Sequence, residues 1–285
     1  MLQFLKVIDY YKREKTHKSI KRDLYAIDHL ITFFNDKNVY SLNRADIRQY
    51  AAFRLSQGVT NGTVNRELRC FSSVLNFYKL EHMLDFVNPV MGLSLSIPDP
   101  IIRYITPREA NTLYKASKDY AKTPHLPAFI ALALNTGCRK TELYQLEWSR
   151  VDFNQRLIIL GSQHTKASKR RFVPMNDRVM ETMEILKHWT KSNCPQSQWV
   201  LTGRDKKSHV VTLTKGFRSA CDRAGIENFR IHDMRHTFAS WLVQSGESLY
   251  VVKELLGHSS IAVTERYAHL SNEPLHNAVL KLPSF

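Results

Sequence analysis

Apolar residues recur every three or four positions along the first 84 residues, which is the pattern of helices that bury one face. The first two stripes consist of Phe4, Leu5, Ile8 and Tyr11, and of Leu24, Ile27, Ile31 and Phe34. Asn43 is placed to cap a third helix that Gly58 ends, and Asn61 or Thr63 opens a fourth. We therefore predict four helices and no strand in this part of the chain.

The pattern changes between residues 88 and 103, where NPVMGLSLSIPDPIIR holds three prolines and no sustained periodicity. Directly after it, Thr106, Pro107 and Glu109 stand in the order of a capping box at a helix start. We interpret the first segment as a linker and expect a second domain to start near Tyr104. The predicted divisions are a helical domain at 1–87, the linker at 88–103, a second domain at 104–270 and a tail at 271–285.

The second domain mixes two periodicities. Helical patterns open it, including the apolar run LPAFIALALNTG, and they return from Asn176 onward. Between them, β-branched and aromatic residues at 156–160 and 170–175 flank the polar segment GSQHTKASK, which is typical of two short strands joined by a loop. The predicted fold class is therefore mainly α, with a small β-sheet or hairpin in the C-terminal domain.

The composition is that of a globular protein with a basic surface. Lys and Arg number 41 against 26 acidic residues, which gives a formal net charge of +15. The excess is spread over the chain, with +5 at residues 1–103 and +10 at 104–285. This spread favours an extended basic surface and a polyanionic partner over a basic tail. A basic protein without a nucleic-acid role is the alternative on charge alone.

Cysteine spacing and the absence of long apolar runs favour a cytoplasmic protein. Cys70, Cys138, Cys194 and Cys221 lie far apart without a CxxC pair, so neither a zinc ribbon nor a disulfide framework is expected. The N-terminus carries charges too early for a signal peptide, and no stretch approaches the roughly 20 apolar residues of a membrane span.

Three segments of the second domain carry candidate chemistry. The first, TGCRKTEL, places Arg139 near a helix N-terminus, where an anion meets both the guanidinium and free backbone N–H groups. Glu142 lies three residues later on the same face and can orient Arg139. A surface Arg–Glu pair is the alternative for this segment taken alone.

The second segment is IHDMRH, in which His232 and Arg235 face the same side of a helix. They present a proton donor or shuttle beside a permanently charged fork that suits phosphate oxygens. His236 lies four residues after His232 and suggests a zinc pair. No acidic ligand set accompanies the two histidines, so we expect no metal site.

The third segment is LLGHSS, followed by TERYAHL. Gly257 ends a helix and leaves His258 in a loop, and Tyr267 lies nine residues further on in a short helix. A tyrosine hydroxyl serves as a covalent nucleophile when it is positioned and activated. Packing of the ring in a core is the alternative for Tyr267 taken alone.

In this order, TGCRKTEL, IHDMRHTFASWLVQSG, LLGHSS and TERYAHL strongly resemble the tyrosine recombinases, in particular phage and genomic-island integrases. The match covers nearly all of residues 104–285, and residues 1–87 are more loosely similar to the helical, SAM-like core-site DNA-binding domain of that family. The resemblance implies a two-domain, C-shaped DNA clamp with a tyrosine recombinase catalytic domain.

The resemblance also implies roles for individual residues. Tyr267 matches the nucleophile, and the other matched catalytic positions are Arg139, Lys166, His232, Arg235 and His258. Lys169 competes with Lys166 for the hairpin lysine, and Glu142 matches a supporting acidic position. The candidate DNA-facing residues, for which ordinary solvated side chains are the alternative, are Arg44, Arg48, Arg66, Arg69, Lys169 and Arg170.

The implied reaction is site-specific recombination. Tyr267 forms a 3′-phosphotyrosyl bond and frees a 5′-hydroxyl that attacks the partner strand, so bond energy is conserved and no cofactor or metal is required. The implied partners are double-stranded DNA at specific sites, three further copies in a synaptic tetramer, and accessory proteins that bend DNA or direct excision. We expect a nucleoid-associated protein that integrates or excises a phage or mobile element. Its tail at 271–285 docks on its own domain or on a neighbouring protomer.

Several alternatives stay open on the sequence. The same chemistry serves a Xer-like dimer resolvase or a DNA invertase, and a type IB topoisomerase-like enzyme would relax DNA without paired sites. A catalytically silent DNA-binding regulator would have no chemical need for the complete residue set. Many lambda-type integrases carry a further N-terminal domain for arm sites, whereas the helices here begin almost at Met1. Either the recombination site is simpler or such a domain has been removed.

Overall fold

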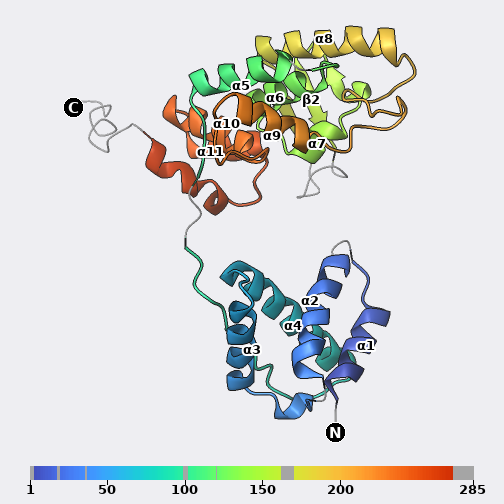
Figure 1. Cartoon of the computed structure of the whole chain (residues 1–285), viewed down its shortest axis with the longest axis vertical. Coiled ribbons are helices and arrows are strands. Elements are labelled where there is room, and N and C mark those ends of the chain that lie inside the picture. The colour runs from blue at the N-terminus through green and yellow to red at the C-terminus, as the bar shows by residue number, and fades with distance from the viewer. Residues whose placement is uncertain are drawn as a thin grey trace, which may run out of the picture. The chain divides into compact units, whose positions relative to one another are not determined.

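The computed structural model describes residues 3–17, 20–35, 37–98, 102–119, 121–161 and 170–271. The chain divides into two compact units, Met1–Pro100 and Ile101–Phe285, each with its own hydrophobic core (Figure 1). The described part is mainly helical and contains one three-stranded sheet, which confirms the predicted fold class. None of the described helices combines the length and the apolar character needed to cross a bilayer.

Four α-helices form the described part of the first unit. They are α1 (Phe4–Glu14), α2 (Ile20–Phe34), α3 (Arg44–Ser56) and α4 (Asn61–Glu81), with the 3-10 turn η1 (Val39–Ser41) before α3. Helix α4 packs against both α1 and α2. Asn43 caps α3 as predicted, since its side-chain oxygen accepts the N–H of Ala45 at 2.8 Å. Helix α4 begins at Asn61, one of the two predicted start residues, and its N-cap residue is Thr60. The Asn61 side chain donates to the carbonyl of Ser96 at 2.7 Å.

The first part of the segment predicted as a linker is anchored on α4. The Asn88 amide donates to Ser72 Oγ at 2.9 Å and to Asn76 Oδ1 at 2.8 Å. The Asn65 side chain forms two hydrogen bonds with the backbone of Leu95, at 2.8 and 2.7 Å. Because these buried amides satisfy backbone groups that have no helix partner, residues 88–96 belong to the first unit.

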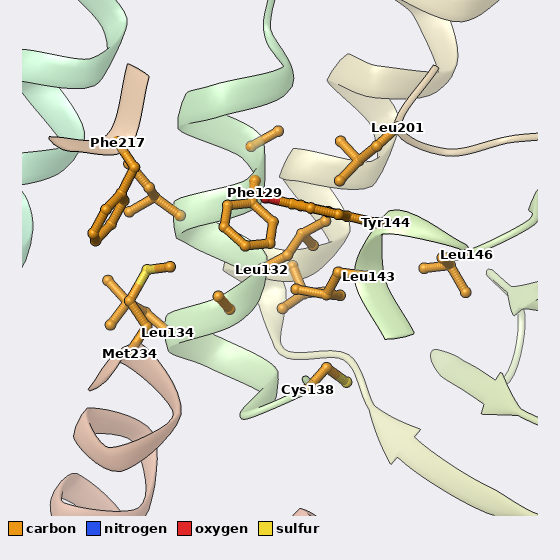
Figure 2. Packing of buried hydrophobic residues seen from close by; sticks show 14 of the residues in the cluster. Phe129, Leu132, Leu134, Cys138, Leu143, Tyr144, Leu146, Leu201, Phe217 and Met234 are labelled. Atoms are coloured by element: carbon orange, nitrogen blue, oxygen red, sulfur yellow. The ribbon is translucent and has the colours of Figure 1, made fainter. Parts of the chain in front are cut away.

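Helix α6 (His125–Thr136) lies at the centre of the second unit. It packs against α5 (Pro107–Asp119), α8 (Asp177–Asn193) and α10 (Asp233–Gln244), while α9 (Thr214–Arg223) packs against α5. Figure 2 shows side chains of α6 between Phe217 and Leu201. The apolar run of this helix thus reflects burial on nearly every side. Helix α5 begins at Pro107 with the predicted reciprocal hydrogen bonds between Thr106 and Glu109, at 2.7 and 3.2 Å.

The sheet consists of β1 (Val151–Asp152), β2 (Leu157–Leu160) and β3 (Arg171–Pro174), antiparallel in the order β1-β2-β3. Strands β2 and β3 are the predicted pair, with Ile158 opposite Val173 and both side chains buried. The two-residue β1 is too short to leave a periodic pattern in the sequence. Residues 162–169, including Lys166 and Lys169, lie outside the described residues.

Candidate active site

A sharp turn between two helices presents the first candidate arginine. Helix α6 ends at Gly137, which has a φ of +60°, and α7 (Lys140–Tyr144) follows with Arg139 as its N-cap residue. A Cβ atom at residue 137 would lie 2.3 Å from the ring of Phe238. Only glycine satisfies both the left-handed backbone and this close approach. Arg139 therefore lies immediately before a helix N-terminus, as predicted.

One buried carboxylate, Glu142 on α7, holds two guanidinium groups. It accepts the Arg139 side chain at 2.9 Å and the Arg139 backbone N–H at 2.8 Å. Its second oxygen also accepts from Arg171 at 2.8 Å. Glu142 is 1% exposed, so both ion pairs lie in a poorly solvated environment where their geometry is well defined. This arrangement gives Glu142 the orienting position expected from the sequence.

Helix ends fix the second candidate arginine. Arg235 on α10 is buried and donates to the carbonyl of Gly137 and to the carbonyl of Leu256, both at 2.7 Å. These carbonyls close α6 and α11 (Leu249–Leu256) and have no partner within their helices. Burial and the charges of Arg139 and Arg171 lower the pKa of Arg235 to about 10, which still leaves it charged at neutral pH.

Sequence reasoning missed a third arginine at this site. Arg171, the first residue of β3, donates to Glu142 and also to the Leu256 carbonyl that Arg235 uses. Arg170, chosen from the sequence, is instead exposed and lies over the ring of Phe172. Strand alternation offered a signal, because Arg171 and the buried Val173 share one face of β3.

The two candidate histidines lie at helix ends beside these arginines. His232 is the exposed N-cap residue of α10 and His258 follows α11, where its Nδ1 is 2.8 Å from Thr264 Oγ1. Desolvation and the charge of Arg235 lower the pKa of His232. Partial burial and the charges of Arg235 and Arg139 lower the pKa of His258 to about 3. Both rings are neutral at physiological pH and retain one N–H for donation.

Tyr267 lies on the 3-10 segment η4 (Glu265–Leu270), where the sequence predicted a short helix. Its side chain is 1% exposed and packs with Ala239, Val243, Val252 and Leu256. The hydroxyl lies 2.6 Å from Nδ1 of His236, a residue first considered only as a metal ligand. Burial raises the pKa of Tyr267, while the charges of Arg235 and Arg266 oppose this effect.

A basic cavity of about 1480 Å³ adjoins this cluster within the second unit. Arg139 and His232 line it together with Phe217, Phe229 and other residues of the segment that precedes α10. Its lining carries more basic than acidic side chains: Arg103, Arg139, Lys140, Arg218 and Arg230 against Asp222 and Glu227. The positive potential of such a surface attracts a polyanion toward the two site residues.

The sequence model described as the phage integrase family matches residues 103–273. The chain belongs to this family. Tyrosine recombinase XerD of Rhizobium meliloti is 31% identical over 82% of this chain and 78% of its own length. The integrase of Salmonella phage P22 is 32% identical over 62% of this chain, which spans 47% of that protein. The protein is accordingly a tyrosine-type site-specific recombinase.

A solved structure of the Tn1549 transposon integrase in complex with a circular intermediate DNA has the same fold as this recombinase. The TM-score is 0.81 at 17% identity, and the match covers 99% of this chain and 98% of the other. The four arginines selected in the first unit of the recombinase, Arg44, Arg48, Arg66 and Arg69, are exposed on α3 and α4. Their exposure leaves them accessible to a ligand.

Proposed function

We propose that this recombinase cleaves and rejoins double-stranded DNA at specific sites with Tyr267 as nucleophile, and that it integrates or excises a phage or mobile element. The observation that carries this proposal is the arrangement of the partly buried Arg139 and the buried Arg235 around the end of α11, with His258 next to it. Tyr267 packs in the same cluster as Leu256, whose carbonyl accepts from Arg235, which supports a common site for the phenol and the guanidinium.

The arginines would stabilise the charge that develops on phosphorus. Attack by the Tyr267 oxygen produces a phosphorane with additional negative charge on its non-bridging oxygens. Preorganised donors such as Arg139 and Arg235 stabilise such a state without reorganising, each by about 3–4 kcal/mol. His258 would donate to a further non-bridging oxygen through its neutral ring. Because the phosphodiester is exchanged and never hydrolysed, no external energy source is needed.

Proton transfer completes the exchange. The leaving 5′-oxygen needs a proton, and we assign its donor to Lys166, which lies outside the described residues. Lys169 is the competing donor. His232 opens α10 beside Arg235, and by its match to the family it would assist proton transfer at the tyrosine. Glu142 contacts no reacting atom in this scheme and acts by holding Arg139 and Arg171 in place.

The first unit would bind the duplex through Arg44, Arg48, Arg66 and Arg69, and Arg170 would contact DNA from the second unit. Exchange between two duplexes requires cleavage of four strands, so four copies would form the synaptic tetramer. We propose that the tail at 271–285, of which residues 272–285 lie outside the described residues, docks on its own domain or on a neighbouring protomer. Proteins that bend DNA or direct excision would act as accessory factors.

A dimer resolvase is the second candidate, because the similarity to tyrosine recombinase XerD extends over 78% of that protein. The two functions differ in their DNA substrates. An integrase joins sites on two different molecules, whereas a resolvase acts on two copies of one site within one molecule. Recombination between plasmids, compared with deletion within a plasmid, separates them.

The nucleophile is tested with nicked suicide duplexes made from the DNA that flanks the gene. We expect wild-type protein to form a covalent protein–DNA band on denaturing gels, and we expect Tyr267→Phe to bind the duplex without forming the band. Tyr250→Phe, a change at an exposed tyrosine of α11, serves as the matched control and should react normally. Specific binding without any covalent band would instead support a silent regulator.

A further inference from the structure

The hydroxyl of Tyr267 is already hydrogen-bonded, and its partner is not one of the residues matched to the family. The distance between Tyr267 Oη and His236 Nδ1 is 2.6 Å. Within the described part of the chain, no hydrogen bond joins His232 to Tyr267. A contact this short fits a phenol O–H that donates to an unprotonated ring nitrogen.

Two anchors hold His236 at this position. Its helix, α10, is fastened to the segment before α5 by Thr237, whose Oγ1 accepts the N–H of Ile105, and by Trp241, which donates to the carbonyl of Ile105 at 2.9 Å. The ring of His236 also lies edge-to-face against His232, with 5.1 Å between centroids. Helix packing therefore fixes the backbone at His236, and the contact with His232 helps to orient its ring.

The charges around His236 favour a neutral ring in the absence of DNA. His232, Arg235 and Arg266 oppose protonation, and Asp233 on α10 favours it. Burial, interaction with a protonated His232 and the charges of Arg235 and Arg266 lower the pKa of His236 to about 4. A DNA phosphodiester bound at Arg139 and Arg235 would offset their positive charge and raise this pKa toward its ordinary value. The imidazole would thus become a stronger base when the substrate arrives.

We propose that His236 is a catalytic residue, the general base that accepts the phenolic proton of Tyr267. As the Oη–P bond forms and the bond from phosphorus to the 5′-oxygen breaks, the proton passes from Oη to Nδ1 of His236. During rejoining, the 5′-hydroxyl attacks, the Oη–P bond breaks and His236 returns the proton to Tyr267. This proposal rests on the proposed nucleophilic role of Tyr267.

Cleavage of the suicide duplex at a range of pH values tests this role. His236→Asn keeps a polar group near Oη but cannot take a proton at neutral pH. We expect its single-turnover rate to fall about 100-fold at pH 7, the usual scale of general-base catalysis. The defect should shrink toward 10-fold or less near pH 9.5, because hydroxide then deprotonates a larger fraction of the phenol without help from a side chain. His269→Asn, a change at an exposed histidine of η4, should match wild type at every pH.

Three outcomes would overturn the assignment. The first is a single-turnover cleavage rate of His236→Asn within threefold of wild type at pH 7. The second is a rate above wild type, which would show that His236 restrains the nucleophile. The third is a defect of equal size at every pH. Thermal melting and binding of the same duplex by His236→Asn should match wild type. If either is changed, His236→Gln is measured in its place and judged by the same three outcomes.

A measurement without DNA separates this inference from the proposed function. Ring ¹⁵N chemical shifts of His236, assigned by comparison with His236→Asn, should show a bare, hydrogen-bonded Nδ1 and a proton on Nε2. A proton on Nδ1 would refute the role of His236 as general base even if the wild-type protein cleaves DNA. Conversely, a bare Nδ1 in a protein that forms no covalent band would leave the tautomer established and reject the nucleophilic function of Tyr267.

Discussion

Among single residues, Glu142 has the greatest influence on the geometry of the site. Its carboxylate is the one acidic group that contacts both Arg139 and Arg171 among the described residues. The nearby Arg235 donates only to main-chain carbonyls among the described hydrogen bonds. The buried cluster therefore carries excess positive charge, which suits an anionic ligand and costs folding free energy in its absence.

Removing this carboxylate should affect both stability and chemistry. We expect Glu142→Ala to lower the free energy of unfolding by about 3 kcal/mol, because it leaves the buried Arg171 and the partly buried Arg139 without their counterion. Covalent complex formation should fall by at least 10-fold in protein that remains folded. Urea unfolding and the suicide-duplex assay measure the two effects. Glu184→Ala, at an exposed position of α8, should change neither.

The lowered pKa of His258 predicts a pH-dependent stability. The folded-state pKa of about 3 lies below the unfolded value of about 6.5. Between these values the unfolded chain binds more protons, so stability is complete above about pH 6.5 and decreases as the pH falls toward 3. We expect the Tm of His258→Asn to fall less than that of wild type between pH 6.5 and 4, by about 5 °C. His269→Asn should follow wild type, and parallel curves for all three proteins would refute the prediction.

At the scale of elements, the end of α11 must come very close to β3. Gly257 has a φ of +65°, and a Cβ atom there would lie 2.7 Å from Nη1 of Arg171. Gly225 has nearly the same φ, +66°, but no atom lies within 4 Å of its hypothetical Cβ. The two glycines share the same backbone requirement and differ in the space available.

Alanine at these glycines separates backbone strain from steric displacement. Gly225→Ala should cost about 1–2 kcal/mol of unfolding free energy from the left-handed backbone alone. Gly257→Ala should cost at least about 1 kcal/mol more, because Arg171 must move in a packed interior. It should also slow covalent complex formation, whereas Gly225→Ala should not. Equal unfolding energies and equal rates for the two variants would show that Arg171 moves aside freely.

The sequence revealed most elements because their signals are local. Periodicity located the four helices of the first unit, and Gly137, Gly257 and Thr106 marked helix ends correctly. Contacts between distant segments left no such signal. Arg171 meets Glu142 across 29 positions, and His236 meets Tyr267 across 31. Which surface each side chain faces depends on how the helices pack, so these partners emerged only in the folded chain.

For the whole molecule, the net charge of +15 predicts a strong dependence of DNA affinity on salt. We expect each single replacement by alanine, at Arg44, Arg48, Arg66 or Arg69, to reduce the slope of the log DNA association constant against log salt concentration by about one. The loss of affinity should be similar for all DNA sequences. Fluorescence anisotropy at several salt concentrations measures this slope. Arg13→Ala is the matched control, because Arg13 on α1 already pairs with Glu14. An unchanged slope in all four variants would place the DNA elsewhere.

The two acceptors that hold Arg235 belong to the main chain. Every amino acid carries such a carbonyl, so no single-codon change can delete one. Alleles that replace Leu256 by a residue of similar bulk should therefore be silent in a genetic screen for lost recombination. At the adjacent Gly257, nearly any codon change introduces a side chain against Arg171. Inactivating alleles should accumulate at the glycine and be rare at the leucine that provides the hydrogen-bond acceptor.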